Sequence, residues 1–222
     1  MIAITFALPT ESAGLTAQLH REKIDSQRVM IVHTGVGQRR CEEKIDQTLK
    51  AVRPDLLISS GFAGGAREGL RVGDLILAEN FSDQALVSSA RQILNNQIVH
   101  VGSLFTSKSI VASVAERNEI ARASGAAAFD METEFIAQAC AARGIRMLSL
   151  RVISDSVAEA LPAPPQILFD LERQKTDFVD LATYLIGHPP ATLRLLRFAR
   201  QIKRARETLT SALVSLLKSD LC

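Results

Sequence analysis

The sequence predicts an α/β fold, with strands and helices that alternate along the chain around a largely parallel or mixed sheet. Short apolar and β-branched runs recur, and segments with helical periodicity lie between them. This alternation is typical of a sheet with helices on its faces. The 222 residues are enough for one domain, residues 1–222, with a substantial core. Hydrophobic residues make up 47% and charged residues 23%, as in an ordinary globular protein.

The expected strands follow the apolar runs in chain order. They span residues 2–8, 28–33, 55–59, 74–78, 98–105, 126–131 and 147–153. The expected helices span residues 39–52, 109–124, 132–143 and 166–186. Pro54 ends the first of these helices, and Gly144 stands at the C-terminal end of the third.

Several acidic and glycine residues lie just past the expected strands. They are Glu11, the segment 61–65, Glu132 and Asp155. In α/β sheets the ligand binds beyond the carboxyl ends of the strands. We therefore expect one pocket to collect these residues.

The composition excludes several classes of function. With no tryptophan and one tyrosine, an aromatic platform for nucleic acid is not expected. No apolar run is long enough to span a bilayer, and the N-terminus reads as a first strand rather than a signal peptide. Cys41, Cys140 and Cys222 are odd in number and far apart, and the four histidines lack ligand spacing. We therefore expect no disulfide framework and no metal site, and a cytoplasmic location.

The last part of the chain is a basic helical extension, residues 191–222. After Pro189 and Pro190 a long helix is expected over residues 192–218, with seven basic residues against one acidic residue between 191 and 218. The whole chain has a net charge of only +2. An apolar stripe runs along this helix through Phe198, Ile202, Leu209, Leu213 and Leu216. The stripe could pack on the domain, or the helix could meet anionic lipid headgroups or a partner at the surface.

Two glycine-rich segments follow strands. They are Gly35-Val36-Gly37 and Gly61-Phe62-Ala63-Gly64-Gly65. Glycine lets backbone N–H groups approach an anion or a sugar hydroxyl, although a simple tight turn explains either segment taken alone. Neither is a dinucleotide fingerprint or a phosphate-binding P-loop.

Taken together, motifs spread over residues 1–187 resemble the nucleoside phosphorylase and nucleosidase superfamily, which includes the methylthioadenosine/S-adenosylhomocysteine nucleosidases. They are Ala7-Leu8-Pro9-Thr10-Glu11, Thr34-Gly35-Val36-Gly37, Ser60-Gly61-Phe62-Ala63-Gly64-Gly65, Leu70-Arg71-Val72-Gly73-Asp74, Asp130-Met131-Glu132 and Val152-Ile153-Ser154-Asp155. The proline-led basic tail from Pro189 to Arg197 is similar to the hopanoid-associated branch, which is thought to cleave adenine from adenosylhopane, a lipid-linked nucleoside.

The resemblance implies a central mixed sheet closing towards a barrel, ringed by helices, in a homo-oligomer. It implies cleavage of a purine N-glycosidic bond without a cofactor. Glu11 would activate the attacking water, and Asp155 would hold a proton for purine N7. Glu132 would accept hydrogen bonds from the ribose 2′ and 3′ hydroxyls, with Met131 under the sugar. The remaining substrate-binding positions implied are Gly61, Phe62, Ala63, Gly64, Ser154 and Ile110, the last where the nucleosidases carry a phenylalanine that stacks on adenine.

The chemistry of N-glycosidic bond cleavage suits these roles for the acidic residues. A purine leaves poorly as an anion, so protonating it lowers the barrier, and fixed carboxylates stabilise an oxocarbenium-like sugar. Asp155 must then keep its proton near neutral pH, for which Val152 and Ile153 supply an apolar approach. Each acid also has a plainer interpretation: Glu132 as a first-turn helix acid, Asp155 as a turn cap, and Glu11 in a solvated loop.

The sequence departs from the phosphorylases of the superfamily at one informative position. They place an arginine two residues before the glycine of the third-strand motif to hold phosphate, and this chain has Ser59 there. Without an arginine guanidinium to pair with it, a phosphate dianion is poorly bound, so water is the expected nucleophile. Phosphorolysis remains an alternative through Arg39, Arg40, Arg67 or a partner subunit. A homologue that binds nucleosides or membranes without activity is the third interpretation.

Overall fold

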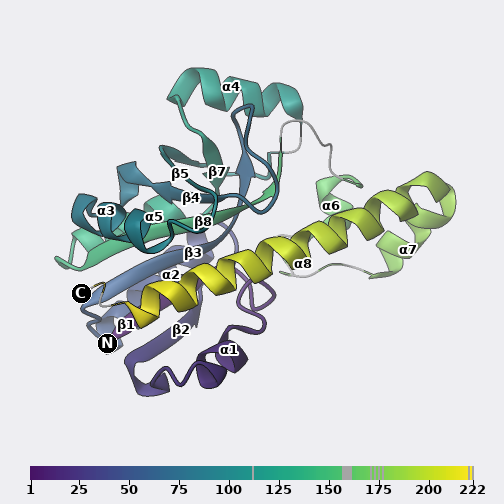
Figure 1. Ribbon diagram of the computed structural model, residues 1–222. Helices are drawn as coiled ribbons and strands as arrows, with labels where there is room; N and C mark the ends of the chain where they lie inside the picture. Colours follow the sequence, from purple (N-terminus) through teal and green to yellow (C-terminus); the bar gives the residue numbers. More distant parts are fainter. Residues whose placement is uncertain are drawn as a thin grey trace.

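The computed structural model describes all residues except 112, 157–161, 171, 173, 175, 177, 220 and 222, so Cys222 lies outside the described part of the chain. A mixed eight-stranded sheet stands between two layers of helices, and a long C-terminal helix crosses one face and continues beyond it (Figure 1). The α/β class predicted from the sequence is confirmed.

The sheet has a main path of six strands. Its order is β2 (Val29–His33), β1 (Ile2–Phe6), β3 (Leu56–Gly65), β8 (Arg146–Asp155), β4 (Leu75–Ala78) and β5 (Val99–Gly102). Neighbours are parallel except β4 and β8, which are antiparallel. β7 (Ala128–Asp130) pairs antiparallel with the far end of β3 and parallel with β6 (Leu104–Thr106). Because β2 and β5 end the path without joining each other, the expectation of a sheet closing towards a barrel is wrong for the described residues.

Each face of the sheet carries its own core, because successive residues of a strand point to opposite sides. Ala3 and Leu57 face one core, together with α2 (Gln38–Ala51) and α5 (Thr133–Ala141). Ile4 and Ile58 face the other core. Its helices are α1 (Leu15–Arg21), α3 (Gln84–Ile93) and α8 (Pro189–Lys218). α4 (Val114–Ser124) sits apart at the top of Figure 1.

Several predicted boundaries change. The predicted strand 98–105 is two strands, β5 and β6, and the predicted helix 166–186 is α6 (Pro165–Leu168) and α7 (Phe178–Gly187) with non-helical residues between them. α1 and α3 were not predicted. β3 and β8 both run further than expected, and this extension forms the candidate site.

The two ends of α8 have different environments. Its C-terminal half is part of the core, where Leu209, Leu213 and Leu216 are at most 1% exposed. Lys218 also forms an ion pair with Glu22. Towards its N-terminus α8 leaves the sheet and lies beside α7 (Figure 1). The packing interpretation therefore holds for the C-terminal half only. We call α7 and residues 189–204 the projecting arm.

No helix among the described residues is both long enough and apolar enough to cross a bilayer.

Candidate active site

The site lies where β1, β3, β7 and β8 end. β3 does not turn at Gly61, as a tight-turn interpretation requires; it continues to Gly65 and stays paired with β8 from Gly61↔Arg151 to Gly64↔Asp155. The register shifts between Ala63 and Gly64, so Ser154 is an extra residue in β8. A bulge of this kind redirects side chains and is common beside active sites.

Glu11 follows β1 and is 6% exposed. Its two carboxylate oxygens accept backbone hydrogen bonds from Leu8 N–H and Phe62 N–H, both at 2.8 Å. Burial raises the pKa of Glu11 above its usual 4.5, against the opposing effect of these bonds and of the Arg151 charge. The interpretation of Glu11 as a solvated loop residue is therefore wrong.

Glycine is required at two positions of β3. A Cβ at Gly61, where φ is +142°, would lie 2.7 Å from Glu11 Oε1 and 2.6 Å from Arg151 Nη1. A Cβ at Gly64 would lie 2.2 Å from the Phe129 ring. These approaches are too close for any side chain, so glycine lets the carboxylate and the guanidinium reach the strand.

Arg151 is a site residue that sequence reasoning missed. It is 1% exposed and forms an ion pair with Asp130 at 2.8 Å. Its Nη1 donates to Ser60 O (2.7 Å), and its Nη2 donates to Ser59 Oγ (2.9 Å) and Thr133 Oγ1 (2.7 Å). The signal in the sequence was an arginine within an otherwise apolar strand, since a buried charge needs partners.

Glu132 lies two residues after β7, at the N-cap position of α5, and is 5% exposed. Its Oε1 accepts a hydrogen bond from Gly37 N–H (2.9 Å), and its side chain does not cap α5. Burial first, and then the charge of Asp130, raise the pKa of Glu132 to about 8, with a smaller contribution from Glu11. Met131, directly before Glu132, is half-buried.

Asp155 is the last residue of β8 and has a partner that the sequence did not predict. The guanidinium of Arg117 in α4 forms an ion pair with Asp155 Oδ2, and Ser154 Oγ donates to Asp155 Oδ1 at 2.6 Å. The immediate partners of Asp155 are therefore polar, and its role as the holder of a proton for purine N7 stays a prediction.

The other predicted binding residues lie along β3 and in the segment between β6 and α4. Phe62 is half-buried and fixes Glu11 through its backbone, and Ala63 O accepts a hydrogen bond from Ser154 Oγ (3.3 Å). Ile110 is half-buried in the segment between β6 and α4. Its neighbour Val111 packs with Phe129, which brings this segment near the Asp155 side of the site.

No group of three potential metal ligands was found among the residues that the structure describes.

Comparison with known proteins adds to this geometry. The sequence profile of the Phosphorylase superfamily matches residues 4–94 and 81–185. The chain belongs to this superfamily. Among curated superfamily relatives, the 5′-methylthioadenosine/S-adenosylhomocysteine nucleosidase of Haemophilus influenzae is 26% identical over 174 residues, covering 66% of this chain and 76% of that protein. The nucleosidase of the same name from Staphylococcus haemolyticus is 25% identical over 166 residues, covering 62% and 73%.

Solved structures show the same fold at lower identity. Native futalosine hydrolase of Helicobacter pylori has a TM-score of 0.72 and 14% identity, over 98% of this chain and 97% of that one. The S-adenosylhomocysteine nucleosidase of Streptococcus pyogenes, in complex with 5-methylthiotubericidin, has a TM-score of 0.71 and 19% identity, over 98% and 95%. The predicted resemblance to nucleosidases is thus confirmed at the level of the superfamily and the fold.

Proposed function

We propose that this protein hydrolyses the N-glycosidic bond of a purine nucleoside, with adenine as the base. The observation that supports this most strongly is that Glu11 and Glu132 are both buried at the strand ends, where Glu11 accepts from Phe62 N–H and Glu132 accepts from Gly37 N–H, with Asp155 further along β3 and β8 at the same edge. The named activity of the curated relatives supports the same class of reaction.

In the proposed reaction, water attacks C1′ while the C1′–N9 bond breaks and its electron pair moves to the purine. Glu11 accepts a proton from the water, a role that suits a carboxylate whose pKa burial raises above its usual value. Glu132 accepts hydrogen bonds from the ribose hydroxyls, and Met131 packs under the sugar. Those acids that are ionised stabilise the positive charge that develops on the ribosyl group. Asp155 donates a proton to purine N7 as the bond breaks, and the proton that Glu11 took from the water replaces it by way of the solvent, which leaves a free base and a free sugar.

The substrate is best identified by a screen for free base. Adenosine, inosine, methylthioadenosine and long-chain 5′-alkyl adenosines cover the base and the 5′ substituent separately. We infer from the tail's similarity to the hopanoid-associated branch that the 5′ group is bulky or lipid-linked, as in adenosylhopane. Faster release of adenine from the long-chain substrates is the expected result. Absence of base release from every compound would refute the proposed hydrolysis.

Phosphorolysis is the second candidate, and the arrangement of the arginines disfavours it. Arg151 occupies the position beside Ser59, but its donors are taken by Ser59, Ser60, Thr133 and Asp130. Arg39 is exposed and pairs with Glu43, and Arg40 donates to Glu172 O at 2.5 Å. We expect base release to be the same with and without inorganic phosphate. If base release requires phosphate, the protein is a phosphorylase and not a hydrolase.

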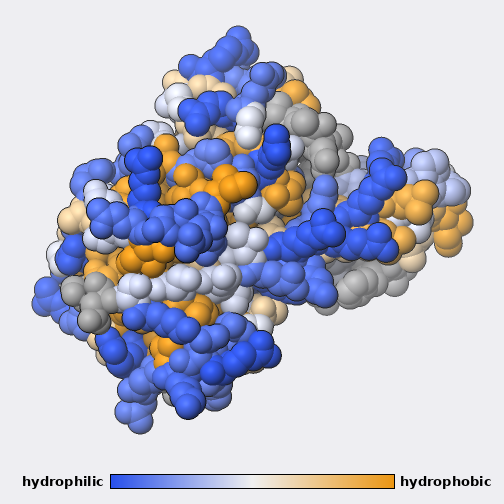
Figure 2. Space-filling view, in the orientation of Figure 1, coloured by the Kyte–Doolittle hydropathy of each residue, from blue (hydrophilic) through white to orange (hydrophobic). Residues whose placement is uncertain are grey.

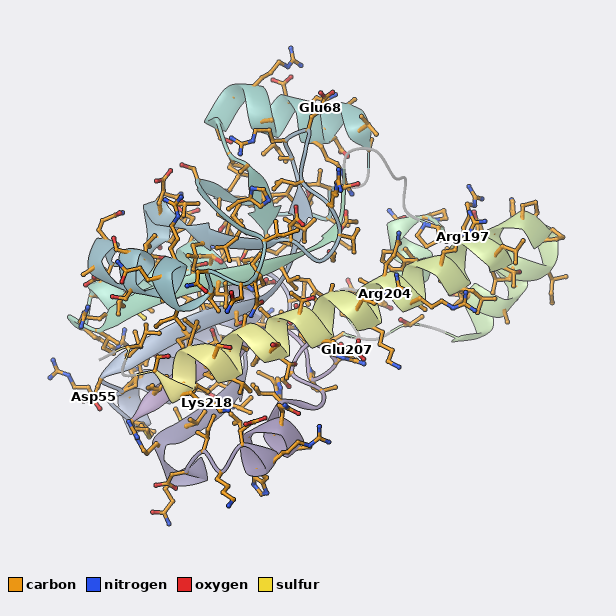
Figure 3. All side chains as sticks on the ribbon, in the orientation of Figure 1. Asp55, Glu68, Arg197, Arg204, Glu207 and Lys218 are labelled. Atoms are coloured by element: carbon orange, nitrogen blue, oxygen red, sulfur yellow. The ribbon has the colours of Figure 1, made fainter. Side chains whose placement is uncertain are left out.

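We further propose that the projecting arm meets anionic lipid. Ile186, Leu193 and Leu196 are 81%, 65% and 51% exposed. Leu193, Leu196, Arg197 and Arg200 follow one another at helical spacing, so apolar and basic side chains share a face. Figure 2 shows hydrophilic side chains along α8 with apolar patches towards the outer end of the arm. Arg197 and Arg204 are labelled on this stretch in Figure 3, and Lys218 is labelled at the packed end of the helix.

Vesicle sedimentation tests the arm. Wild type should bind vesicles that contain phosphatidylserine and release them in high salt. Reversing Arg197 and Arg200 to Glu should weaken binding by more than roughly 30-fold, since losing each basic residue near the surface costs about 1 kcal/mol and the added negative charges are repelled by the anionic lipid. The same reversal at exposed Arg91 in α3 is the control. Equal binding by both variants would contradict the proposal. The homo-oligomer and the cytoplasmic location both stay predictions. Light scattering during size exclusion can test the homo-oligomer.

A further inference from the structure

Gln174 makes a contact across the molecule that the proposed reaction does not yet use. It lies between α6 and α7, at the base of the projecting arm, and is half-buried. Its Oε1 accepts a hydrogen bond from Val36 N–H at 2.6 Å, and its Nε2 donates to Val36 O at 3.3 Å. One side-chain amide therefore pairs with both backbone groups of a residue 138 positions away in the sequence.

The contact falls on the loop Gly35-Val36-Gly37, which joins β2 to α2. The pairing of this segment with β1 continues as far as Gly35, whose N–H donates to Ala7 O at 3.0 Å, and Val36 is the next residue. Backbone groups that leave a sheet need other partners, and an amide side chain offers an acceptor beside a donor. With φ of +79° and +89°, the two glycines use conformations that side chains rarely adopt. Because glycine prefers no single conformation, outside contacts must define this loop.

The backbone of Gln174 indicates that these contacts fix its position. Its φ is +56°, in the left-handed region, although it is not a glycine. Such a conformation costs free energy and persists where the surroundings determine it. A second contact holds the same turn, since Arg40 in the first turn of α2 donates to Glu172 O at 2.5 Å.

The contact reaches Glu132 through a single peptide group. Val36 C=O and Gly37 N–H belong to the same peptide unit, which is planar, so that its oxygen and its hydrogen point in opposite directions. Gln174 Nε2 donates to the oxygen, and the N–H donates to Glu132 Oε1 at 2.9 Å. Holding the oxygen therefore sets the direction of the N–H, and hydrogen bonds in such a chain strengthen one another.

We propose that Gln174 is a positioning residue for Glu132, which holds the Val36–Gly37 peptide so that Gly37 N–H keeps the carboxyl group in place for the ribose hydroxyls. This inference rests on the proposed function, in which Glu132 binds the sugar. Gln174 acts through the loop, and it joins the base of the projecting arm to the sugar-binding acid. The plainer alternative is that Gln174 only fastens the turn between α6 and α7 to the body.

The titration of Glu132 separates these alternatives without requiring turnover. The Gly37 N–H bond favours the ionised carboxylate, so losing it should raise the pKa of Glu132 above the wild-type value of about 8. Carbon-13 NMR of the glutamate carboxyl groups measures this pKa, and the signal is assigned by its absence in Glu132→Gln. The charged groups that act on Glu132 stay in place in every Gln174 variant; they are Asp130, Arg151 and Glu11.

Two substitutions remove the amide in different ways. Gln174→Met keeps the length of the side chain and removes both hydrogen bonds. Gln174→Gly also removes them but suits a positive φ, so a shift shared by both variants comes from the amide and not from backbone strain. The matched control is Glu172→Gln in the same turn, where the described contacts are made by the backbone N–H and C=O. The pKa of Glu132 should rise in both Gln174 variants and stay at its wild-type value in the control.

Calorimetry measures the contribution of the sugar to binding. The probe is 9-deazaadenosine, whose base is joined to the sugar through carbon and is not released, compared with free 9-deazaadenine. The ratio of the two affinities should fall roughly fivefold in both Gln174 variants, the value of one typical hydrogen bond, while the affinity for the free base stays unchanged.

If the variants lose urea stability but keep the wild-type pKa of Glu132, Gln174 only fastens the turn and the inference is overturned. A raised pKa with an unchanged contribution of the sugar overturns the assignment to ribose binding. Base release by wild type reports on the proposed function separately. If wild type releases no base from any nucleoside, the proposed hydrolysis fails, while the pKa of Glu132 in the variants still decides whether Gln174 positions it.

Discussion

Replacing Glu132 with glutamine should change how stability depends on pH. The side chain is buried, and its pKa is raised from 4.5 to about 8 in the folded protein. Between these two values the folded protein holds a proton that the unfolded chain has lost. Raising the pH through this window therefore destabilises the wild type. Glutamine occupies nearly the same volume, can still accept the Gly37 N–H bond, and does not titrate.

The size of the effect follows from proton linkage. One proton gives a slope of about 1.4 kcal/mol per pH unit, so the interval from 4.5 to about 8 amounts to roughly 5 kcal/mol, of which about 3 kcal/mol is reached by pH 7. The free energy of unfolding of wild type, relative to Glu132→Gln, should fall steadily between pH 5 and pH 8 and level off above it. Below about pH 4.5, Glu132 is protonated in both the folded and the unfolded protein, so its titration no longer changes the difference in unfolding free energy between the two proteins.

Urea unfolding followed by far-UV circular dichroism at several pH values measures this difference. Glu134→Gln, at a partly exposed position in the first turn of α5, controls for the loss of one negative charge at this end of the helix. A difference between wild type and Glu132→Gln that stays constant from pH 5 to pH 8 would refute the reasoning. It would mean that Glu132 is ionised throughout, and that Arg151 outweighs burial and Asp130.

Three further outcomes follow from the contacts at the strand ends and in the core. Glu11→Gln should lower kcat by about 10²–10⁴-fold while its far-UV circular dichroism stays that of the native protein. The rate of wild type should rise with pH on the acid side of its profile, with a midpoint above 4.5, because the proton acceptor must be ionised. Arg151→Met should cost about 3–5 kcal/mol of unfolding free energy by leaving Asp130 buried without its cation, and unchanged urea stability would contradict this. Leu213→Ala should cost about 2–5 kcal/mol, whereas Leu193→Ala on the projecting arm should cost little, and equal losses would contradict the division of α8.

The strands and the order of the motifs were predictable because they depend on local patterns. Alternating apolar runs define β1, β2 and β4 within about two residues. α3 was missed although a signal was present: Asp83 caps it by accepting from Ala85 N–H and Leu86 N–H. α1 is only seven residues long and begins after Gly14, which has a left-handed conformation. The segment is too short for a helical periodicity of apolar residues to stand out.

The candidate site was predicted as a set of acids, and its cations were not. Arg151 and Arg117 lie in segments that read as an apolar strand and a surface helix. Their partners are Asp130 and Asp155, 21 and 38 positions away in the sequence. A single sequence carries no local pattern for pairs at such separation. For Gly61 the sequence left a tight turn open as an explanation, because the reason for its glycine is the approach of side chains from two other segments.

The packed and projecting halves of α8 form one continuous helix, and this limits how the molecule can be oriented. At 1.5 Å per residue, Leu193 stands roughly 18 Å along the axis from Ala205, where the helix enters the core. Because the helix is continuous, any surface bound at Leu193 is held at a fixed distance and angle from the strand ends. A substrate drawn from that surface would always arrive from the same side.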